Sequence, residues 1–168
     1  MKKILAVIDG ISEWSGKIVS FLIVFITAIL LYEVAMRFVF NAPTNWAHEL
    51  TMHMFGFLSV LAGAYVLRYD EHVKIDIIYN FFSPRGQAII DSFTYLVFFL
   101  FVSLLLWHST AIAMWAIKIG QTVSPSPWGS PLWPTKSAVP VAALLLLLQG
   151  IAQFIRVLTF AITGKELK

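Results

Sequence analysis

The sequence contains no cysteine and few charged residues for its length. Without cysteine the chain has no disulfide, no thiolate metal site, no iron–sulfur cluster and no covalently attached c-type haem. Charged residues make up 12% of the 168 residues, against roughly 25% in soluble domains. So few charges cannot cover the surface of a soluble globule, and 59% of the residues are hydrophobic. The composition therefore predicts a protein of the lipid bilayer.

The chain also lacks the short motifs that mark several large enzyme classes. It has no Walker A sequence and no HExxH, GxSxG or GxGxxG pattern, which speaks against an ATPase, a protease or a dinucleotide enzyme. We therefore expect no enzymatic activity and no cofactor. The net charge of +3 comes from bases that lie beside hydrophobic runs, so it indicates membrane topology rather than a nucleic-acid partner.

Four long apolar segments dominate the sequence, at residues 18–40, 46–68, 92–117 and 137–160. Each approaches or exceeds the ~20 residues that a helix needs to cross ~30 Å of hydrocarbon. Such runs are helical in lipid, because a helix satisfies its own backbone hydrogen bonds. We therefore predict an all-α membrane protein, with a single domain of four transmembrane helices over residues 1–168.

Two further helical stretches are expected outside these spans. Residues 4–18 have apolar positions at helical spacing, which predicts an amphipathic helix on the membrane surface that runs into the first span. Asp9 and Glu13 interrupt this stretch, so we expect it to remain in the mature protein rather than to be a signal peptide. Between the second and third spans, residues 69–91 predict a short interfacial helix, and Pro84 suits the first turn of the helix that follows.

The distribution of Lys and Arg predicts the orientation. With the N-terminus inside, both termini are cytoplasmic and nine bases lie on the cytoplasmic side, against three on or near the outside. The nine are Lys2, Lys3, Lys17, Arg68, Lys74, Arg85, Arg156, Lys165 and Lys168, and the three are Arg37, Lys118 and Lys136. We therefore expect a multi-pass membrane protein, with the loop before the fourth span outside.

Charged side chains within spans need a partner or a function. Glu33 and Arg37 are four residues apart on the first span, and Glu49 and His53 have the same spacing on the second, so each pair shares a helix face. A tight hairpin at 41–45 places Arg37 and Glu49 at one depth and Glu33 and His53 at another. We therefore predict Arg37–Glu49 and Glu33–His53 contacts across the helices, as a structural interhelical network or a proton relay.

Other polar and aromatic residues suggest contacts between helices or with partners. Gln149 and Gln153 share one face of the last span, with Gln149 near the middle of the bilayer, and such amides often bond neighbouring helices. The proline-rich link before this span is expected to be extended. Its Trp128 and Trp133 suit the headgroup layer and are candidates for meeting an external partner.

Two alternative functions remain open on these residues. His53 and His108 lie at similar depth on different spans, where they are candidate ligands of a b-type haem in the membrane anchor of a redox complex. Glu33 is the candidate switch of a small, self-dimerising exporter. A visible absorption spectrum identifies the first alternative, and transport by this chain alone identifies the second.

Three stretches together resemble the small membrane subunit of TRAP (tripartite ATP-independent periplasmic) transporters, the DctQ or SiaQ type. RFVFNAPTNWAHEL resembles the family's R-[FY]-x-F-N-x-P-x-x-W-x-E-E-L hairpin, apart from His48, where the family commonly has an acid. RYDEHVKID is similar to the family's R-x-x-E-H-[IV]-x-[IV]-D after the second span. The family's last link and fourth helix are matched by Ser126-Pro127-Trp128, Pro131-Leu132-Trp133-Pro134, Pro140 and Leu148-Gln149.

The resemblance implies a role and two partners. In such systems a periplasmic binding protein delivers an organic acid anion, such as sialic acid or a C4-dicarboxylate. A large multi-span subunit then carries the anion inward with sodium ions by an elevator movement. The small subunit has four spans and is a fixed, non-catalytic scaffold beside the large one. By this resemblance the hairpin is set by Arg37, Asn41, Pro43, Trp46 and Glu49.

Overall fold

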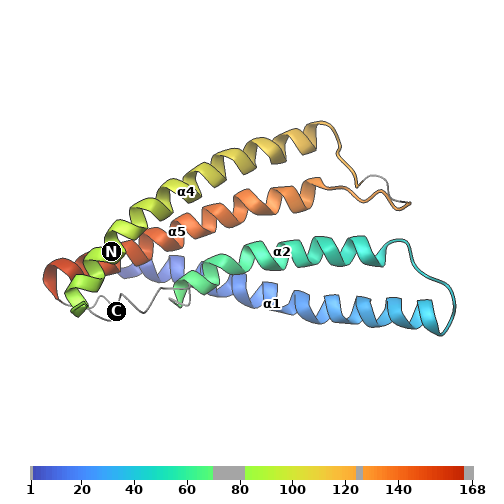
Figure 1. Cartoon of the computed structure of the whole chain (residues 1–168), viewed down its shortest axis with the longest axis horizontal. Coiled ribbons are helices and arrows are strands. Elements are labelled where there is room, and N and C mark those ends of the chain that lie inside the picture. Colours follow the sequence, from blue (N-terminus) through green and yellow to red (C-terminus); the bar gives the residue numbers. More distant parts are fainter. Residues whose placement is uncertain (1, 70–81, 124–126, 165–168) are drawn as a thin grey trace.

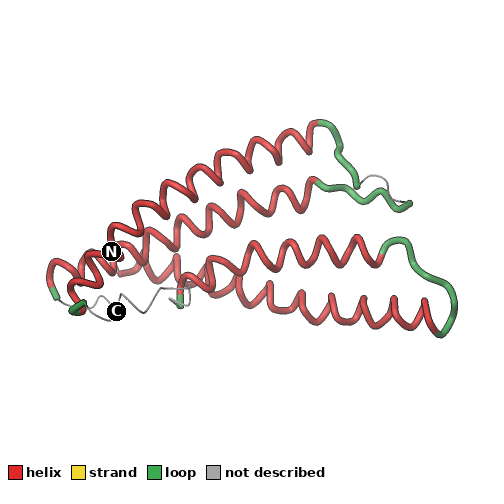
Figure 2. The backbone as a smooth tube through the Cα atoms, viewed as in Figure 1, coloured by secondary structure: helices red, strands yellow, loops and turns green. Residues whose placement is uncertain are grey.

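The computed structural model describes residues 2–69, 82–123 and 127–164. Within these ranges the chain forms four long helices, α1 (Lys2–Phe38), α2 (Ala47–Arg68), α4 (Pro84–Lys118) and α5 (Trp133–Thr163). Two antiparallel hairpins, α1–α2 and α4–α5, lie side by side, with the chain termini at one end and both hairpin loops at the other (Figure 1). Apart from one isolated bridge between Thr122 and Pro131, the regular structure of these residues is helical (Figure 2).

All four helices are long and apolar enough to cross a membrane. The 22-residue α2 is about 33 Å long, which fits the hydrocarbon thickness without strong tilt. The other three have 31 to 37 residues and extend beyond the predicted spans at one or both ends. The predicted all-helical, four-span architecture is confirmed, and the chain is a multi-pass membrane protein.

The N-terminal stretch 4–18 is helical and runs into the first span, as predicted, because α1 is one helix from Lys2 to Phe38. Its Asp9 and Glu13 accept hydrogen bonds from Arg156 of α5 and from Tyr69 at the end of α2. The interfacial helix predicted between the second and third spans falls largely on residues 70–81, which lie outside the described residues.

The start of α4 is as predicted. Ser83 is its N-cap and its hydroxyl accepts a hydrogen bond from Gly86 N at 3.3 Å. A proline follows in the first turn, where no backbone N–H is needed for the helix.

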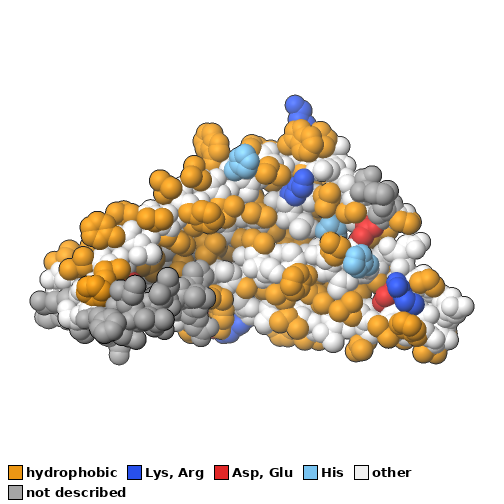
Figure 3. All heavy atoms as spheres, in the orientation of Figure 1, with side chains coloured by type: hydrophobic (Ala, Val, Ile, Leu, Met, Phe, Trp, Pro, Cys, Tyr) orange, Lys and Arg blue, Asp and Glu red, His pale blue; other side chains and the backbone are white. Residues whose placement is uncertain are grey.

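Helix α5 is the centre of the bundle. It packs against α4, α2 and α1, while α4 makes its extensive contacts with α5 alone. The α5 side chains that are buried are small, apart from Gln149: Ala138, Ala142, Ala143, Gly150 and Ala152. Small residues let helix backbones approach closely, which is how helices associate in lipid. The outward faces of both hairpins are covered with hydrophobic side chains (Figure 3).

The contact between α4 and α5 depends on an aromatic cluster against a glycine. Tyr95 and Phe99 of α4 pack on Phe154 of α5, and Phe98 packs on both of them, with ring centroids 5.6 to 6.2 Å apart. Gly150 lies beside them, and a Cβ atom at this position would be 2.5 Å from Phe98 Cε1. The glycine therefore sets the distance between the two helices.

Candidate functional site

The loop of the α1–α2 hairpin is held by Glu33. Its Oε1 accepts hydrogen bonds from Arg37 Nη2 at 2.7 Å and Arg37 Nε at 3.1 Å, one turn further along α1. Its Oε2 accepts hydrogen bonds from the backbone N–H of Thr44, at 3.1 Å, and from the Thr44 hydroxyl. The predicted sharing of one helix face by Glu33 and Arg37 is confirmed, and the carboxylate ties the end of α1 to the turn.

The hairpin motif residues have identifiable roles in this turn. Asn41 has a positive φ of 51°, the left-handed conformation that often ends a helix and that asparagine tolerates. The N–H of the next residue, Ala42, donates to Met36 O at 2.9 Å. Trp46, the N-cap residue of α2, stacks on Tyr32 with 5.9 Å between ring centroids. The sequence N-x-P-x-x-W thus closes α1 and begins α2.

The predicted Arg37–Glu49 and Glu33–His53 pairs are wrong. Glu49 accepts hydrogen bonds from the N–H of Ser130, at 3.1 Å, and from its hydroxyl. His53 Nε2 lies 2.9 Å from the Ser130 hydroxyl, and His53 Nδ1 lies 2.6 Å from the Thr135 hydroxyl. Counting residues from the hairpin says nothing of the direction in which each group points around the helix axis. Glu49 and His53 share a face, as predicted, and this face points to α5.

These four residues, Glu49, His53, Ser130 and Thr135, form the loop cluster. Glu49 is 7% exposed and Ser130 is 2% exposed. Hydrogen bonds within the cluster therefore replace the bonds to water that these groups lose on burial. It joins α2 to the link between α4 and α5, two parts of the chain about 80 residues apart. The spacing of Glu49 and His53 indicated that these two residues lie close together. Nothing in the sequence indicated that Ser130 is their partner.

The described parts of the link, residues 119–123 and 127–132, are held together by hydrogen bonds. Val123 N donates to Ser130 O at 2.9 Å, and Leu132 N donates to Gln121 O at 2.8 Å. Lys136 Nζ donates to the Gln121 side chain at 2.6 Å. These bonds hold the two described parts of the link side by side. Trp128 in the second part is 44% exposed, and Trp133 at the start of α5 is 46% exposed.

A second polar group, at the end where the termini lie, was missed by the sequence analysis. Asp9 of α1 forms an ion pair with Arg156 of α5. Gln149 Nε2 donates to Asp9 Oδ1 at 3.1 Å, and the Ser12 hydroxyl donates to Gln149 Oε1 at 2.7 Å. Gln149 is fully buried. It lies beside these polar groups because α1 begins at Lys2, well before the predicted span at 18–40, and brings its own polar residues to it.

The same group extends to α2. Arg68 Nη1 donates to Asp9 O at 2.9 Å and forms an ion pair with Glu13. Gln153 Nε2 donates to Arg68 O at 2.9 Å. The hydroxyl of Tyr69 donates to Glu13 Oε2 at 2.6 Å, which raises the pKa of Tyr69 to about 12. These residues, with Ser12, Gln149 and Arg156, form the terminal cluster, which joins three helices.

The terminal cluster confirms part of the sequence analysis. Gln149 and Gln153 share a face and bond to other helices, as predicted. The ion pairs of this cluster had one indication in the sequence. Two acidic residues lie one turn apart near the N-terminus, and arginines for which no partner was predicted lie toward the ends of two other helices. The acidic residues were used only against a signal peptide and the arginines only for topology, so the pairing was missed.

The structure does not favour the two alternative functions. Both ring nitrogens of His53 contact hydroxyl groups, and His108 is exposed on α4, which packs extensively on α5 only. The two histidines are therefore not arranged as a pair of ligands to one haem. The carboxylate of Glu33 is fully engaged within its own hairpin. Among the described residues no group of three or more His, Asp or Glu could hold a metal ion.

Comparison with known proteins identifies the family. Residues 11–160 match the profile of the DctQ component of tripartite ATP-independent periplasmic transporters. A curated relative is the sialic acid TRAP transporter permease protein SiaT of Haemophilus influenzae (strain 86-028NP), which is 29% identical over 97 residues. That match covers 58% of this chain and 15% of the relative, so the matched region is a small part of that longer relative. The profile covers nearly the whole chain, and the chain belongs to the DctQ family of TRAP transporter components.

Proposed function

We propose that this chain is the small, non-catalytic subunit of a sodium-coupled TRAP transporter. It acts as a scaffold beside a large membrane subunit that carries an organic acid anion inward. The binding protein that captures the anion is periplasmic. Membership of the DctQ family supports a transporter component, and the role within the complex rests on the polar groups of this chain.

The observation that carries the scaffold role is the closure of both polar clusters. In the described part of the chain, no buried side-chain nitrogen or oxygen lacks a hydrogen-bond partner. Glu33 and Asp9 accept hydrogen bonds from this chain at both carboxylate oxygens, and Glu49 accepts two at Oε2. A group that carries a proton or a sodium ion must exchange partners during transport. Clusters that bond the helices to one another at both ends of the bundle are instead typical of a rigid scaffold.

The orientation follows from the same clusters and from the distribution of bases. We place the terminal cluster and both termini in the cytoplasm of a bacterium, because nine bases lie on this side. The loop cluster then lies toward the periplasm. It holds Ser130 of the link, and the exposed Trp128 nearby is where we expect a binding protein to dock. The chain is thus a multi-pass protein of the inner membrane.

The substrate class is an organic acid anion, either sialic acid or a C4-dicarboxylate. The name of the Haemophilus relative refers to sialic acid, which supports the first. The choice between them belongs to the binding protein and the large subunit, because the saturated polar groups of this chain offer no site for an anion.

The test is purification of the tagged chain from its native membranes in mild detergent, with partners identified by mass spectrometry. We expect a stoichiometric protein of about a dozen spans. Vesicles that contain both proteins and the binding protein should take up the anion only with a sodium gradient, and vesicles with this chain alone should take up none. Recovery of the chain alone, or with redox subunits, would contradict the proposal.

A further inference from the structure

One face of α4 carries aromatic and polar side chains that no other part of the described chain covers. Trp107 is 80% exposed and His108 is also exposed. Neither ring has a hydrogen-bond partner among the described residues. This face includes the exposed Phe101 and Leu104, and it lies away from α5, the helix on which α4 packs.

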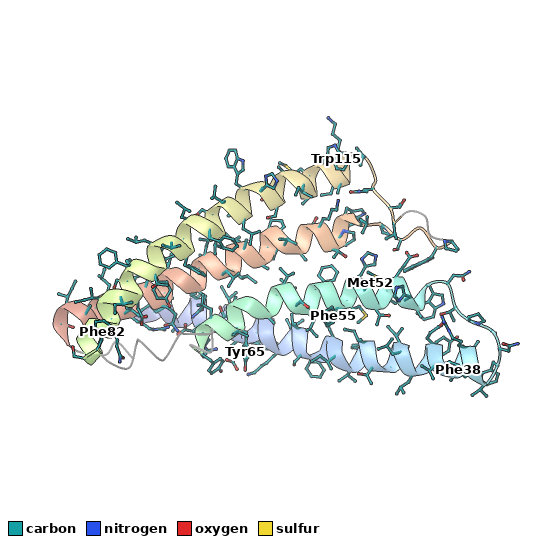
Figure 4. The ribbon with its side chains drawn as sticks, in the orientation of Figure 1. Phe38, Met52, Phe55, Tyr65, Phe82 and Trp115 are labelled. Carbon is teal, nitrogen blue, oxygen red and sulfur yellow. The ribbon has the colours of Figure 1, made fainter. Side chains whose placement is uncertain are left out.

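The position of His108 along α4 makes this exposure unusual. Figure 4 labels Trp115 near the loop end of α4 and Phe82 just before its other end. His108 lies ten residues before Lys118, the last residue of α4, which is ~15 Å along the helix axis. Pro84, the first residue of α4, lies 24 residues before it, which is ~36 Å along the axis. His108 therefore lies inside the apolar helix, about two-thirds of the way along α4.

The outward face of α1 provides a contrast. Its hydroxyl groups bond to the carbonyls of their own helix: Thr27 Oγ1 donates to Ile23 O at 2.8 Å and Ser20 Oγ donates to Lys17 O at 2.7 Å. Such a face can lie in lipid without unsatisfied donors. An imidazole needs both a donor and an acceptor, and hydrocarbon offers neither. The α4 face is thus suited to a protein surface and the α1 face to lipid.

We propose that the α4 face of Phe101, Leu104, Trp107 and His108 docks a membrane-spanning helix of the large TRAP subunit. That helix presents a hydroxyl, amide or carboxyl group to His108. The proposal rests on the function proposed above and specifies which side of this chain meets the partner. The size of the Haemophilus relative favours a large partner over a second copy, because the matched region is 15% of that protein.

The absence of cysteine from the chain permits a clean cross-linking test. A benzophenone is attached to a single cysteine at Leu104 or Trp107 on α4, and in matched controls at Phe21 or Val24, which are similarly exposed on α1. The tagged chain is irradiated in its native membranes. We expect the α4 sites to yield an adduct with the large subunit and the α1 sites to yield lipid adducts only.

Other outcomes separate this proposal from the function it rests on. Lipid adducts alone at the α4 sites, or adducts with twice the mass of this chain, would overturn the docking face while the large subunit still co-purifies. Failure of the unmodified chain to recover any large subunit would overturn the proposed function and the docking face with it.

A substitution at His108 tests the polar contact. His108→Leu should reduce the amount of recovered large subunit about three- to tenfold, because the loss of one interhelical hydrogen bond in a membrane weakens the affinity by about this factor. His108→Gln keeps a donor and an acceptor and should retain the partner, and Thr27→Val on α1 should have no effect. Circular dichroism checks that each variant is equally helical. Equal recovery with His108→Leu and the unmodified chain would refute the contact.

Discussion

The fully buried Gln149 permits a quantitative test of the terminal cluster. Gln149→Met keeps the volume of the side chain and removes both hydrogen bonds, one from Ser12 and one to Asp9. Each bond is worth about 0.5–1.5 kcal/mol, and membrane values average near the lower end. We expect the free energy of unfolding to fall by about 1–3 kcal/mol.

The assay is thermal unfolding of the purified chain in detergent, followed by gel filtration of the remaining folded fraction. For a chain of this size each kcal/mol corresponds to roughly 2–4 °C in Tm. The control is Leu144→Met, an exposed position on the same helix, which should leave Tm unchanged. Ser12→Ala removes one of the two bonds, so it should have about half of the effect.

The combination of the two changes decides whether the hydrogen bonds are the cause. Because Ser12 and Gln149 share one bond, the double variant should lose less stability than the sum of the single variants. Strict additivity, or a Tm of Gln149→Met equal to that of the Leu144→Met control, would refute the reasoning.

Three further predictions concern packing, the loop and pH. Gly150→Ala forces a Cβ into the adjacent phenylalanine ring and should cost about 1–3 kcal/mol of unfolding free energy, whereas Gly10→Ala has open space and should cost nothing. Trp128→Ala should weaken binding-protein-dependent uptake while the membrane subunits still co-purify; unchanged uptake would exclude the loop. The pKa of Tyr69 is raised to about 12, so its ultraviolet titration should move toward the ordinary ~10 in Glu13→Gln. The stabilising bond is present below pH ~10 and is lost as pH rises through the folded pKa.

Much of the local structure was predictable, because it depends on interactions within one turn or one span. Apolar length predicted the four helices. The spacing of four residues predicted the Glu33–Arg37 pair and the shared face of Glu49 and His53. A proline in the first turn marked the start of α4. Each of these relations is fixed by helix geometry, whatever the helix packs against.

The partners across helices were not predictable in the same way. The Asp9–Arg156 ion pair joins residues 147 apart in the chain, and the Glu49–Ser130 bond joins residues 81 apart. In a soluble helix the apolar stripe indicates which face is buried. In lipid both the packed and the exposed faces are apolar, so the pattern does not indicate how each helix is rotated.

The sequence by itself therefore determined the number of spans and, through its motifs, the family. Only the tertiary structure decided which way the polar groups point, and hence that Glu49 and His53 bond to Ser130 and Thr135 instead of to α1. It also showed that the early acidic residues belong to a cluster of three helices. The physical reason is that depth follows from counting residues along one helix, whereas direction follows from close packing against the others.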